Sequence, residues 1–403
     1  MPVQTPTAPT TVLPATPRAA ARPSTGSLVV IGTFGFVLPI MRLVDFAGGR
    51  VNASAADLLI LPVLFLVRGR LLKTGALGYW LFGLWMVNVV SWTLSVSVLT
   101  LTVLQRECAK LAFCYLYALA GFGIGRELRS QNALVKGMLW SAIPMAAYGM
   151  VAFFTRRPDW YFDSSRVAGT FGDANAFGIY LGMLLPLVGS AGAGWMIMPL
   201  FIGAGVVSFS RTGLAAIGSS LALNSLHLGL KRYLLVAAAC VFVFVTIYGI
   251  AITTTKVGRR LANYQGSLEE RQSLWARAAE VVTDHPVIGV GKGNWEAVSG
   301  SHTLPHNTFL SVTADGGLIG LAVLLIPVGV WVGRGLRRPA ARAWAIAVFA
   351  GLVGGLAVSL DNFRLFWLAV GVLAAVLSAT GSYQGTAAAA RAGIHSPRNR
   401  HWR

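Results

Sequence analysis

The chain has 403 residues, of which 55% are hydrophobic and only 12% are charged, and its mean hydropathy is +0.65. Soluble domains carry about 25% charged residues, so this composition excludes a soluble globular protein and predicts a polytopic membrane protein. The formal net charge is +19. We attribute this charge to membrane topology, in which short basic loops stay in the cytoplasm, and we expect no nucleic-acid partner.

The first 26 residues are rich in Pro, Thr and Ala, and we predict that 1–26 is a disordered cytoplasmic tail. Beyond it, apolar stretches of about 17–25 residues, each long enough to cross the hydrocarbon core, recur along the chain. We therefore predict an all-α polytopic membrane protein, with one transmembrane domain at 27–380 and a basic cytoplasmic tail at 381–403. About twelve transmembrane helices are expected, at 27–44, 55–69, 77–98, 107–125, 134–154, 174–190, 194–209, 211–229, 233–252, 308–333, 343–360 and 363–380.

Basic loops alternate with less basic ones in this arrangement. With both chain ends inside, the positive-inside rule is satisfied by every short basic cluster. These clusters are "RGRLLK" (68–73), "GRELRSQNALVK" (125–136), "LKR" (230–232) and "GRGLRRPAARA" (333–343). Two loops, about 155–173 and 253–306, then lie on the outer face. We predict a protein of the bacterial inner membrane whose outer loops face the periplasm or the exterior.

The loop 253–306 is by far the longest connection, and long loops in compact proteins are usually functional or disordered. Apolar residues at helical spacing predict that it contains an amphipathic helix and is ordered: they are Leu274, Trp275, Ala278 and Val281. Both outer loops are basic, although basic residues are disfavoured on that side of the membrane. Their cations are Arg156, Arg157, Arg166, Lys256, Arg259, Arg260, Arg271, Arg277 and Lys292.

Arg211 lies in "SFSRTG" (208–213), a tight turn between two predicted helices at the outer boundary. The flanking serines and Thr212 favour a polar pocket around this arginine. The alternative is an arginine that snorkels to the membrane interface.

Several motifs that suggest other chemistry are incomplete. "GVGKGN" (289–294) resembles a phosphate loop, but Lys292 is followed by Gly, so we interpret the segment as a turn that needs backbone freedom. His302 and His306 are four residues apart, yet no third His or Cys ligand lies nearby, and we expect no metal site. The residues that remain are arginines, which bind phosphate through their planar forks, and one histidine, which is a common general base. Beside a bilayer, this combination suggests a lipid-linked diphosphate donor and a hydroxyl acceptor.

Four sequence blocks together resemble the O-antigen ligase and O-antigen polymerase superfamily. They are "RVAGTFGDANAFGIYLGMLLPL" (166–187), "SFSRTG" (208–213), "RQSLWARAAEVVTDHPVIGVGKGNW" (271–295), and "HN" (306–307) followed by "GLIG" (317–320). The resemblance covers about residues 160–380. At Asp173-Ala174 the family often has a small polar residue and a proline, so no role is assigned to Asp173.

The resemblance implies a metal-independent membrane glycosyltransferase of the C-type fold, without a cofactor. Such a protein takes a glycan from undecaprenyl or a related polyprenyl diphosphate at the outer leaflet. It transfers the glycan to a hydroxyl on lipid A core, on another lipid-linked glycan or on a protein. The family's functional arginines match Arg211 and Arg271, its essential histidine matches His306, and a basic position of the first block matches Arg166.

From these matches we expect His306 to be the general base and Arg211 and Arg271 to bind the diphosphate. Further substrate contacts are expected from Arg166, Asn175, Arg259 and Arg260. Asn307 has two interpretations, a helix cap or a substrate contact. The glycines 316, 317 and 320 are expected to permit close helix packing.

The absence of a candidate carboxylate nucleophile predicts single displacement with inversion. Two alternatives from other classes are a lipid-linked glycan transporter or flippase and a non-catalytic cell-wall scaffold. The sequence does not separate a ligase from a polymerase.

Overall fold

A computed structural model describes residues 23–391, apart from 41–43, 47–50, 73, 95–100, 156–161, 164–165, 191–193, 227–237, 239–263 and 361–362. The predicted helix at 233–252, apart from residue 238, lies outside the described residues, as do Arg259 and Arg260.

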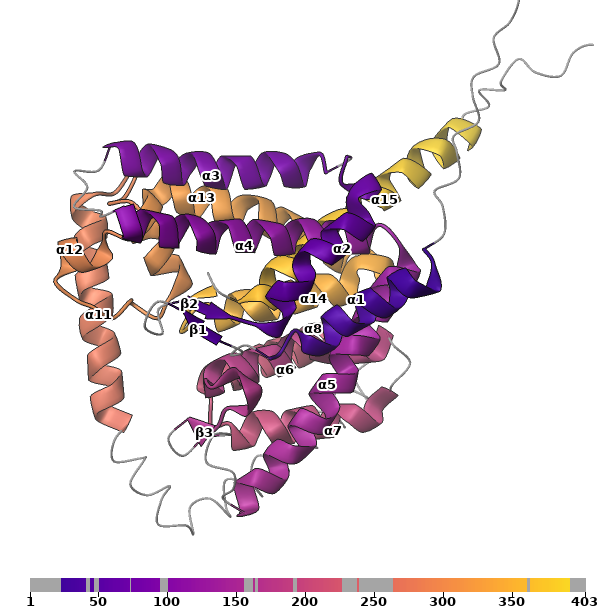
Figure 1. Ribbon diagram of the computed structural model, residues 1–403, viewed down its shortest axis with the longest axis horizontal. Helices are drawn as coiled ribbons and strands as arrows, with labels where there is room; N and C mark the ends of the chain where they lie inside the picture. Colours follow the sequence, from indigo (N-terminus) through magenta and orange to yellow (C-terminus); the bar gives the residue numbers. More distant parts are fainter. Residues whose placement is uncertain are drawn as a thin grey trace, which may run out of the picture.

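The described part is a helical bundle with two short hairpins (Figure 1). Its helices are α1 (Thr25–Val37), α2 (Ala55–Leu71), α3 (Ala76–Leu94), α4 (Leu101–Gly125), α5 (Leu128–Thr155), α6 (Ala174–Ser190), α7 (Gly194–Val207), α8 (Arg211–Ser225), α11 (Tyr264–Asp284), α12 (Trp295–Ser299), α13 (Thr308–Leu336), α14 (Pro339–Gly354) and α15 (Arg364–Arg391), with the 3-10 turn η2 (Gly169–Phe171). The antiparallel hairpins are β1 (Val44–Phe46) with β2 (Val51–Ala53) and β3 (Phe162–Asp163) with β4 (Arg166–Val167).

The predicted all-helical architecture is confirmed, and two boundaries differ from the prediction. The first helix was expected to reach residue 44 but ends at Val37, because Pro39 has no backbone N–H to continue the helix and the chain then enters β1 at Val44. The last helix, α15, continues past residue 380 to Arg391, into the segment predicted as a tail.

Among the described residues, four helical stretches are long and apolar enough to cross a membrane: Ala76–Leu94, Val103–Gly125, Leu128–Thr155 and Thr308–Leu336. Shorter apolar helices accompany them, at Thr25–Val37, Ala174–Gly189, Ile197–Val207, Pro339–Gly354 and Arg364–Ala379. These helices agree with a multi-pass membrane protein, while the number of twelve spans stays a prediction.

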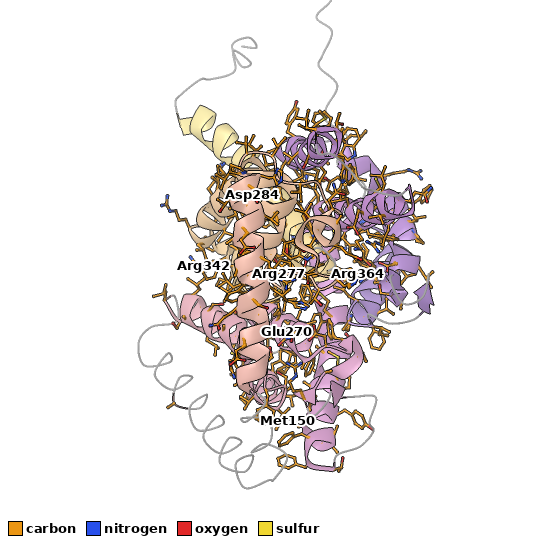
Figure 2. The ribbon with its side chains drawn as sticks, turned by 90° about the vertical axis from the view of Figure 1, so that its left-hand side faces the viewer. Met150, Glu270, Arg277, Asp284, Arg342 and Arg364 are labelled. Carbon is orange, nitrogen blue, oxygen red and sulfur yellow. The ribbon has the colours of Figure 1, made fainter. Side chains whose placement is uncertain are left out.

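Two of the predicted cytoplasmic loops meet at one end of the bundle. Arg70 of α2 forms an ion pair with Glu127 after α4, at 2.6 Å. The neighbouring Arg126 donates a hydrogen bond of 2.9 Å to Ser378 of α15. α11 lies at the opposite end, where it stands across the ends of α3, α4 and α13 (Figures 1 and 2). We call this second end the α11 end.

The amphipathic helix predicted in the long loop is α11. Leu274, Ala278 and Val281 are buried and Trp275 is half-buried, as their helical spacing predicted. Ala278 and Val281 pack in a small core with residues of the following loop and α13: Val290, Trp295 and Ala314. The polar face, with Glu270 and Arg277, is exposed along the front of the molecule in Figure 2. The described part of the long loop is therefore ordered and partly helical.

Helix α13 is broken at Gly317, whose φ of 65° and ψ of −167° are non-helical. The break frees backbone N–H and C=O groups that the helix itself no longer satisfies. The segment after α11 supplies the missing partners. The bonds run from Val290 N to Ala314 O, from Gly291 N to Asp315 O and from Leu318 N to Pro286 O, each at 2.8 Å. The long loop is thus joined to α13 by its backbone.

Glycines make this contact possible. A side chain on Gly317 would collide with the carbonyl of Val287, and one on Gly289 with the carbonyl of Ala314. Gly289, Gly291 and Gly293 all have positive φ, which confirms that "GVGKGN" is a turn. The predicted packing role holds for Gly316 and Gly320, which face Val87 of α3. Gly317 also permits close packing, but with the segment around Val287 and not with another helix, and it breaks α13.

We expect Gly317→Ala to lower the free energy of unfolding by on the order of 3 kcal/mol. The new side chain would add strain at a conformation that only glycine adopts and a backbone collision. Gly329→Ala, on the same helix with open space around it, should leave stability unchanged or slightly raised. Thermal unfolding of both variants in the same detergent measures the difference, and equal melting temperatures would contradict this role of Gly317.

Candidate functional site

His306 is held on its N-terminal side by α11. Trp275 Nε1 donates a hydrogen bond of 2.8 Å to the carbonyl of Pro305, the residue before the histidine. Arg271 lies four residues before Trp275 on α11, so both side chains share one helix face. The spacing "RQSLW" therefore places a cation and the anchor of His306 on the same side of α11.

On the C-terminal side, Asn307 and Thr308 fix the start of α13. Asn307 is the N-cap, because its side-chain oxygen accepts hydrogen bonds from Phe309 N at 2.9 Å and Leu310 N at 3.1 Å. An N-cap contributes about 1 kcal/mol. The interpretation of Asn307 as a helix cap is thus confirmed, and substrate contact stays a hypothesis.

Thr308 docks this helix start on the turn between α14 and α15. Its N–H donates to Gly355 O at 2.8 Å and its hydroxyl donates to Val358 O at 2.7 Å. The same hydroxyl accepts from Leu360 N at 2.9 Å. Helix α11 therefore holds the residue before His306, and the start of α13 and the α14–α15 turn hold the residues after it.

The backbone of His306 itself is strained. Its φ of 49° lies in the left-handed region, which costs an L-residue about 1–2 kcal/mol. Among the described residues, the other non-glycine residue of positive φ is Phe209, two positions before Arg211. Such strain persists where the surrounding structure enforces it, commonly at functional sites. At His306 the anchored neighbours enforce it, and the side chain is left exposed.

Arg211 is presented by the start of α8. Ser210 caps this helix by accepting from Gly213 N at 2.9 Å, and its hydroxyl donates to Asn175 Oδ1 of α6 at 2.9 Å. Gly213 lies against the backbone of Gly178, so neither position has room for a side chain. The "SFSRTG" block thus docks α8 on α6 and leaves Arg211 exposed at the helix mouth.

Arg166 reaches the same place from β4. Its Nη1 lies 3.4 Å from Asn175 Oδ1, which also accepts from Ser210. Asp173 Oδ1 accepts from the backbone N–H of Asn175 at 2.8 Å. The side-chain oxygen of Asn175 therefore accepts hydrogen bonds from both Arg166 and Ser210, and so links Arg166 to the start of α8. Its predicted substrate contact stays a proposal.

The charges of these residues act on one another. Burial lowers the pKa of Arg271, and the nearby charges of Arg166 and Arg211 lower it further, against the opposing effect of Asp173. Partial burial is also the largest cause of the lowered pKa of His306, followed by the charge of Arg271, while Asp173 again opposes. Arg271 thus lies within electrostatic reach of Arg166, Arg211 and His306. We call these four residues the arginine–histidine cluster.

Three features of this cluster were not predicted from the sequence. Asp173, to which we assigned no role, supplies negative charge near both Arg271 and His306. Trp275, predicted only as part of an apolar face, also donates the hydrogen bond to Pro305. The docking of Thr308 depends on a turn far along the chain, so no local signal could have revealed it.

His302 and Lys292 belong to the same loop as His306 but have other contacts. His302 is exposed and forms a contact of 2.6 Å with Glu296. Lys292 is buried, and its ammonium lies 3.7 Å from the carboxylate of Asp315. The described residues contain no group of three or more His, Cys, Asp and Glu side chains that could hold a metal ion.

The fold and the site define a helical membrane protein with arginines and one histidine gathered at one end of its bundle. Residues 196–325 match the family model of O-antigen ligase. This match confirms the predicted resemblance and supports the O-antigen ligase and polymerase superfamily. The matched segment contains Arg211, Arg271 and His306, whereas Arg166 and Asn175 precede it. No curated protein matches the chain.

We expect the pKa of His306 to lie below the ordinary histidine value of about 6.5 and to rise in the variant Arg271→Gln. The substitution removes a positive charge that disfavours the imidazolium. Arg277→Gln, on the exposed face of the same helix, should leave the pKa unchanged. Titration of labelled histidines by NMR, with the His306 signal assigned through His306→Gln, measures all three proteins. An equal shift in both arginine variants would rule out a specific effect of Arg271.

Proposed function

We propose that this protein is a glycosyltransferase of the O-antigen ligase or polymerase type. It transfers a glycan from a polyprenyl-diphosphate-linked donor to a hydroxyl on an acceptor. The observation that carries the proposal is the arginine–histidine cluster at the α11 end of an apolar bundle. A single histidine among guanidinium groups suits a reaction with an anionic leaving group and an acceptor that loses a proton.

The arginines bind the donor diphosphate. Guanidinium forks make bidentate hydrogen bonds to phosphate oxygens and keep their charge in a partly dry site. Arg211 and Arg271 neutralise the negative charge that grows on the diphosphate as it leaves. One such preorganised donor contributes on the order of 3 kcal/mol to lowering the barrier. Arg166 extends the positive surface, and Arg259 and Arg260 are further candidates for donor contact.

His306 removes the proton of the acceptor hydroxyl. As the oxygen attacks the anomeric carbon, the bond from that carbon to the diphosphate oxygen breaks, and its electron pair leaves with the diphosphate. This single displacement inverts the anomeric centre and needs neither metal nor cofactor. A positioned base contributes about 10²–10⁴-fold. The lowered pKa keeps the imidazole neutral, and so able to accept a proton, at neutral pH.

The α11 end faces the periplasm or the exterior in this proposal, and the basic loops and both tails face the cytoplasm of a bacterium. A transporter or flippase would place its polar site near mid-membrane. A scaffold would have no use for a strained histidine among arginines. The charged cluster at helix ends therefore favours the transferase.

The decisive test is transfer by purified protein in proteoliposomes that contain a lipid-linked oligosaccharide, with EDTA present throughout. His306→Ala should abolish transfer yet retain donor binding, because the arginines are intact. His302→Ala is the matched control and should keep most activity, since the exposed imidazole of His302 contacts Glu296 and no residue of the cluster is among its described contacts. Lipid movement without product would support a transporter. Transfer by folded His306→Ala, or loss of parental activity in EDTA, would disprove the proposed mechanism.

A second prediction concerns Arg211. Arg211→Lys keeps the charge but loses the planar fork, so we expect transfer to fall by at least about tenfold. Arg277→Lys, an exposed arginine on the polar face of α11, provides the comparison and should transfer at the parental rate. Initial rates at several donor concentrations separate weaker donor binding from slower chemistry. Equal rates for Arg211→Lys and the parent would remove Arg211 from the diphosphate clamp.

A further inference from the structure

A buried ion pair joins the starts of α2 and α15. Arg364, the first residue of α15, donates to the carboxylate of Asp57 through Nε at 2.8 Å and through Nη2 at 2.6 Å. Tyr117 of α4 donates a third hydrogen bond to Asp57, at 2.8 Å. Asp57 Oδ2 also accepts from Ser54 N at 2.7 Å, which completes the capping box of α2. One carboxylate therefore ties three helices together.

The gain in stability does not by itself account for this pair. The side chains of Arg364 and Asp57 are only 12% and 6% exposed, and taking two charges out of water costs several kcal/mol for each ion. Apolar side chains of similar volume often stabilise a fold as well as a buried ion pair does. A planar fork on both carboxylate oxygens adds directional bonds, which an apolar contact lacks. The pair therefore fixes the orientation of α15 relative to α2.

The start of α15 also holds the turn on which Thr308 docks. Two donors that flank Arg364 in the chain, Phe363 N at 3.0 Å and Trp367 Nε1 at 3.1 Å, bond to the carbonyl of Leu360. Leu360 N donates in turn to Thr308 Oγ1 at 2.9 Å. A series of contacts thus leads from the ion pair, through the turn, to a residue two positions after His306.

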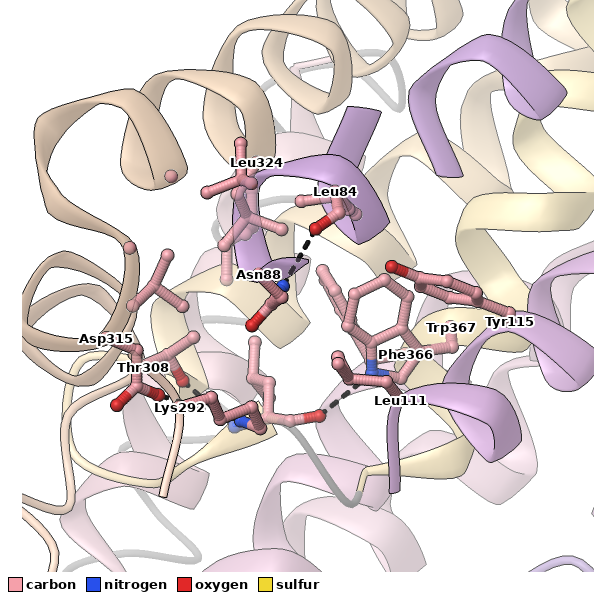
Figure 3. Close-up of a pocket in the computed structure, with 16 residues that line it drawn as sticks. Leu84, Asn88, Leu111, Tyr115, Lys292, Thr308, Asp315, Leu324, Phe366 and Trp367 are labelled. Atoms are coloured by element: carbon pink, nitrogen blue, oxygen red, sulfur yellow. Dashed lines mark hydrogen bonds and ion pairs between the residues drawn. The ribbon is translucent and has the colours of Figure 1, made fainter. Parts of the chain in front are cut away.

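Packing alone leaves this turn room to move. A cavity of about 60 Å³ adjoins it, and its wall includes Thr308, Leu360 and Trp367 (Figure 3). Side chains in a close-packed interior are held by their neighbours on every side. Beside a cavity that restraint is missing on one side. The position of the turn therefore depends on its hydrogen bonds and on the ion pair at the start of α15.

We propose that Asp57 and Arg364 are positioning residues, which hold the α14–α15 turn and, through Thr308, set the position of His306. The proposal rests on the proposed function, in which His306 is the base. A base must lie within hydrogen-bond reach of the proton that it removes, and a misplacement of about 1 Å can cost on the order of 10²-fold in rate. Neither Asp57 nor Arg364 contacts the substrate in this proposal.

The pair can be removed without leaving a lone buried charge. The double variant Asp57→Asn with Arg364→Met has no charge at either position, and the amide keeps an oxygen for the cap at Ser54. We expect it to fold, with kcat lowered by about tenfold or more. KM for the lipid-linked donor should change little, because Arg211 and Arg271 are intact.

The matched control is an ion pair at the other end of the bundle. Arg70 and Glu127 are 2.6 Å apart and both partly buried. Arg70→Met with Glu127→Gln removes this pair in the same way, and we expect parental kcat. Melting temperatures of both double variants in the same detergent measure the effect of each pair on stability.

The pKa of His306 gives a readout that does not depend on transfer. Partial burial and then the charge of Arg271 lower this pKa, so an imidazole displaced from its place should have a higher pKa, closer to the ordinary value. NMR titration should show this rise in the Asp57→Asn, Arg364→Met variant and no change in the control. A pair with a structural role alone would lower the melting temperature without moving the pKa.

Thr308→Val tests the path from the ion pair to the histidine. This variant lacks the hydroxyl that bonds to Val358 O and Leu360 N, so we expect the pKa of His306 to rise in it too. Added to the Asp57→Asn, Arg364→Met variant, it should lower kcat by less than the product of the two separate effects, because both changes act on one turn. Fully multiplicative effects would contradict the path through Thr308.

An unshifted pKa of His306 in the folded Asp57→Asn, Arg364→Met variant would overturn the proposal, whether or not kcat falls. So would an equal shift in the control. If the parental protein transfers nothing while the pKa rises in the Asp57→Asn, Arg364→Met variant alone, the proposed function fails and the positioning of His306 by the ion pair stands.

Discussion

The backbone joint at Gly317 is the constraint on which the site depends. A membrane-spanning helix normally satisfies its own backbone, so a break inside α13 is tolerated only if other groups complete the hydrogen bonds. The segment 286–291 completes them, and this fixes the loop that follows α11. α11 then holds Pro305 through Trp275 and carries Arg271 toward His306. The joint at Gly317 thus links α13 to the helix that carries Arg271.

The strained histidine follows from the same arrangement. A left-handed φ costs about 1–2 kcal/mol, which is small beside several hydrogen bonds of roughly 1 kcal/mol each on the flanking residues. Asn307 and Thr308 alone accept or donate several such bonds, from the start of α13 and from the α14–α15 turn. The imidazole therefore has an anchored backbone and an exposed side chain. That combination suits a base that must keep its position and exchange protons with water.

The sequence predicted those features whose signals are local. Helical spacing revealed the buried face of α11, and the capping preference of Asn307 marked the start of α13. The alternation of basic and less basic loops predicted that Arg70 and Arg126 lie on the same side of the membrane. This agrees with the contacts of Arg70 with Glu127 and of Arg126 with Ser378 at one end of the bundle. What it missed depends on distant partners. Gly317 is recognisable as a helix break only when Val287 lies against it. Lys292 was predicted only as a cation of the long loop, and its burial beside Asp315 depends on the contact of that loop with α13.

The electrostatics of the cluster explain how one histidine can act among several arginines. Partial burial, and after it the positive charge of Arg271, oppose the imidazolium and lower the pKa of His306, and the positive N-terminal end of α13 acts in the same direction. In the proposed step, however, the imidazole gains a positive charge while the diphosphate gains a negative one. The field that penalises the first change stabilises the second, so the two effects offset each other within the site. Once the diphosphate departs, the field again favours the neutral base, and the exposed imidazole can release its proton to water for the next acceptor.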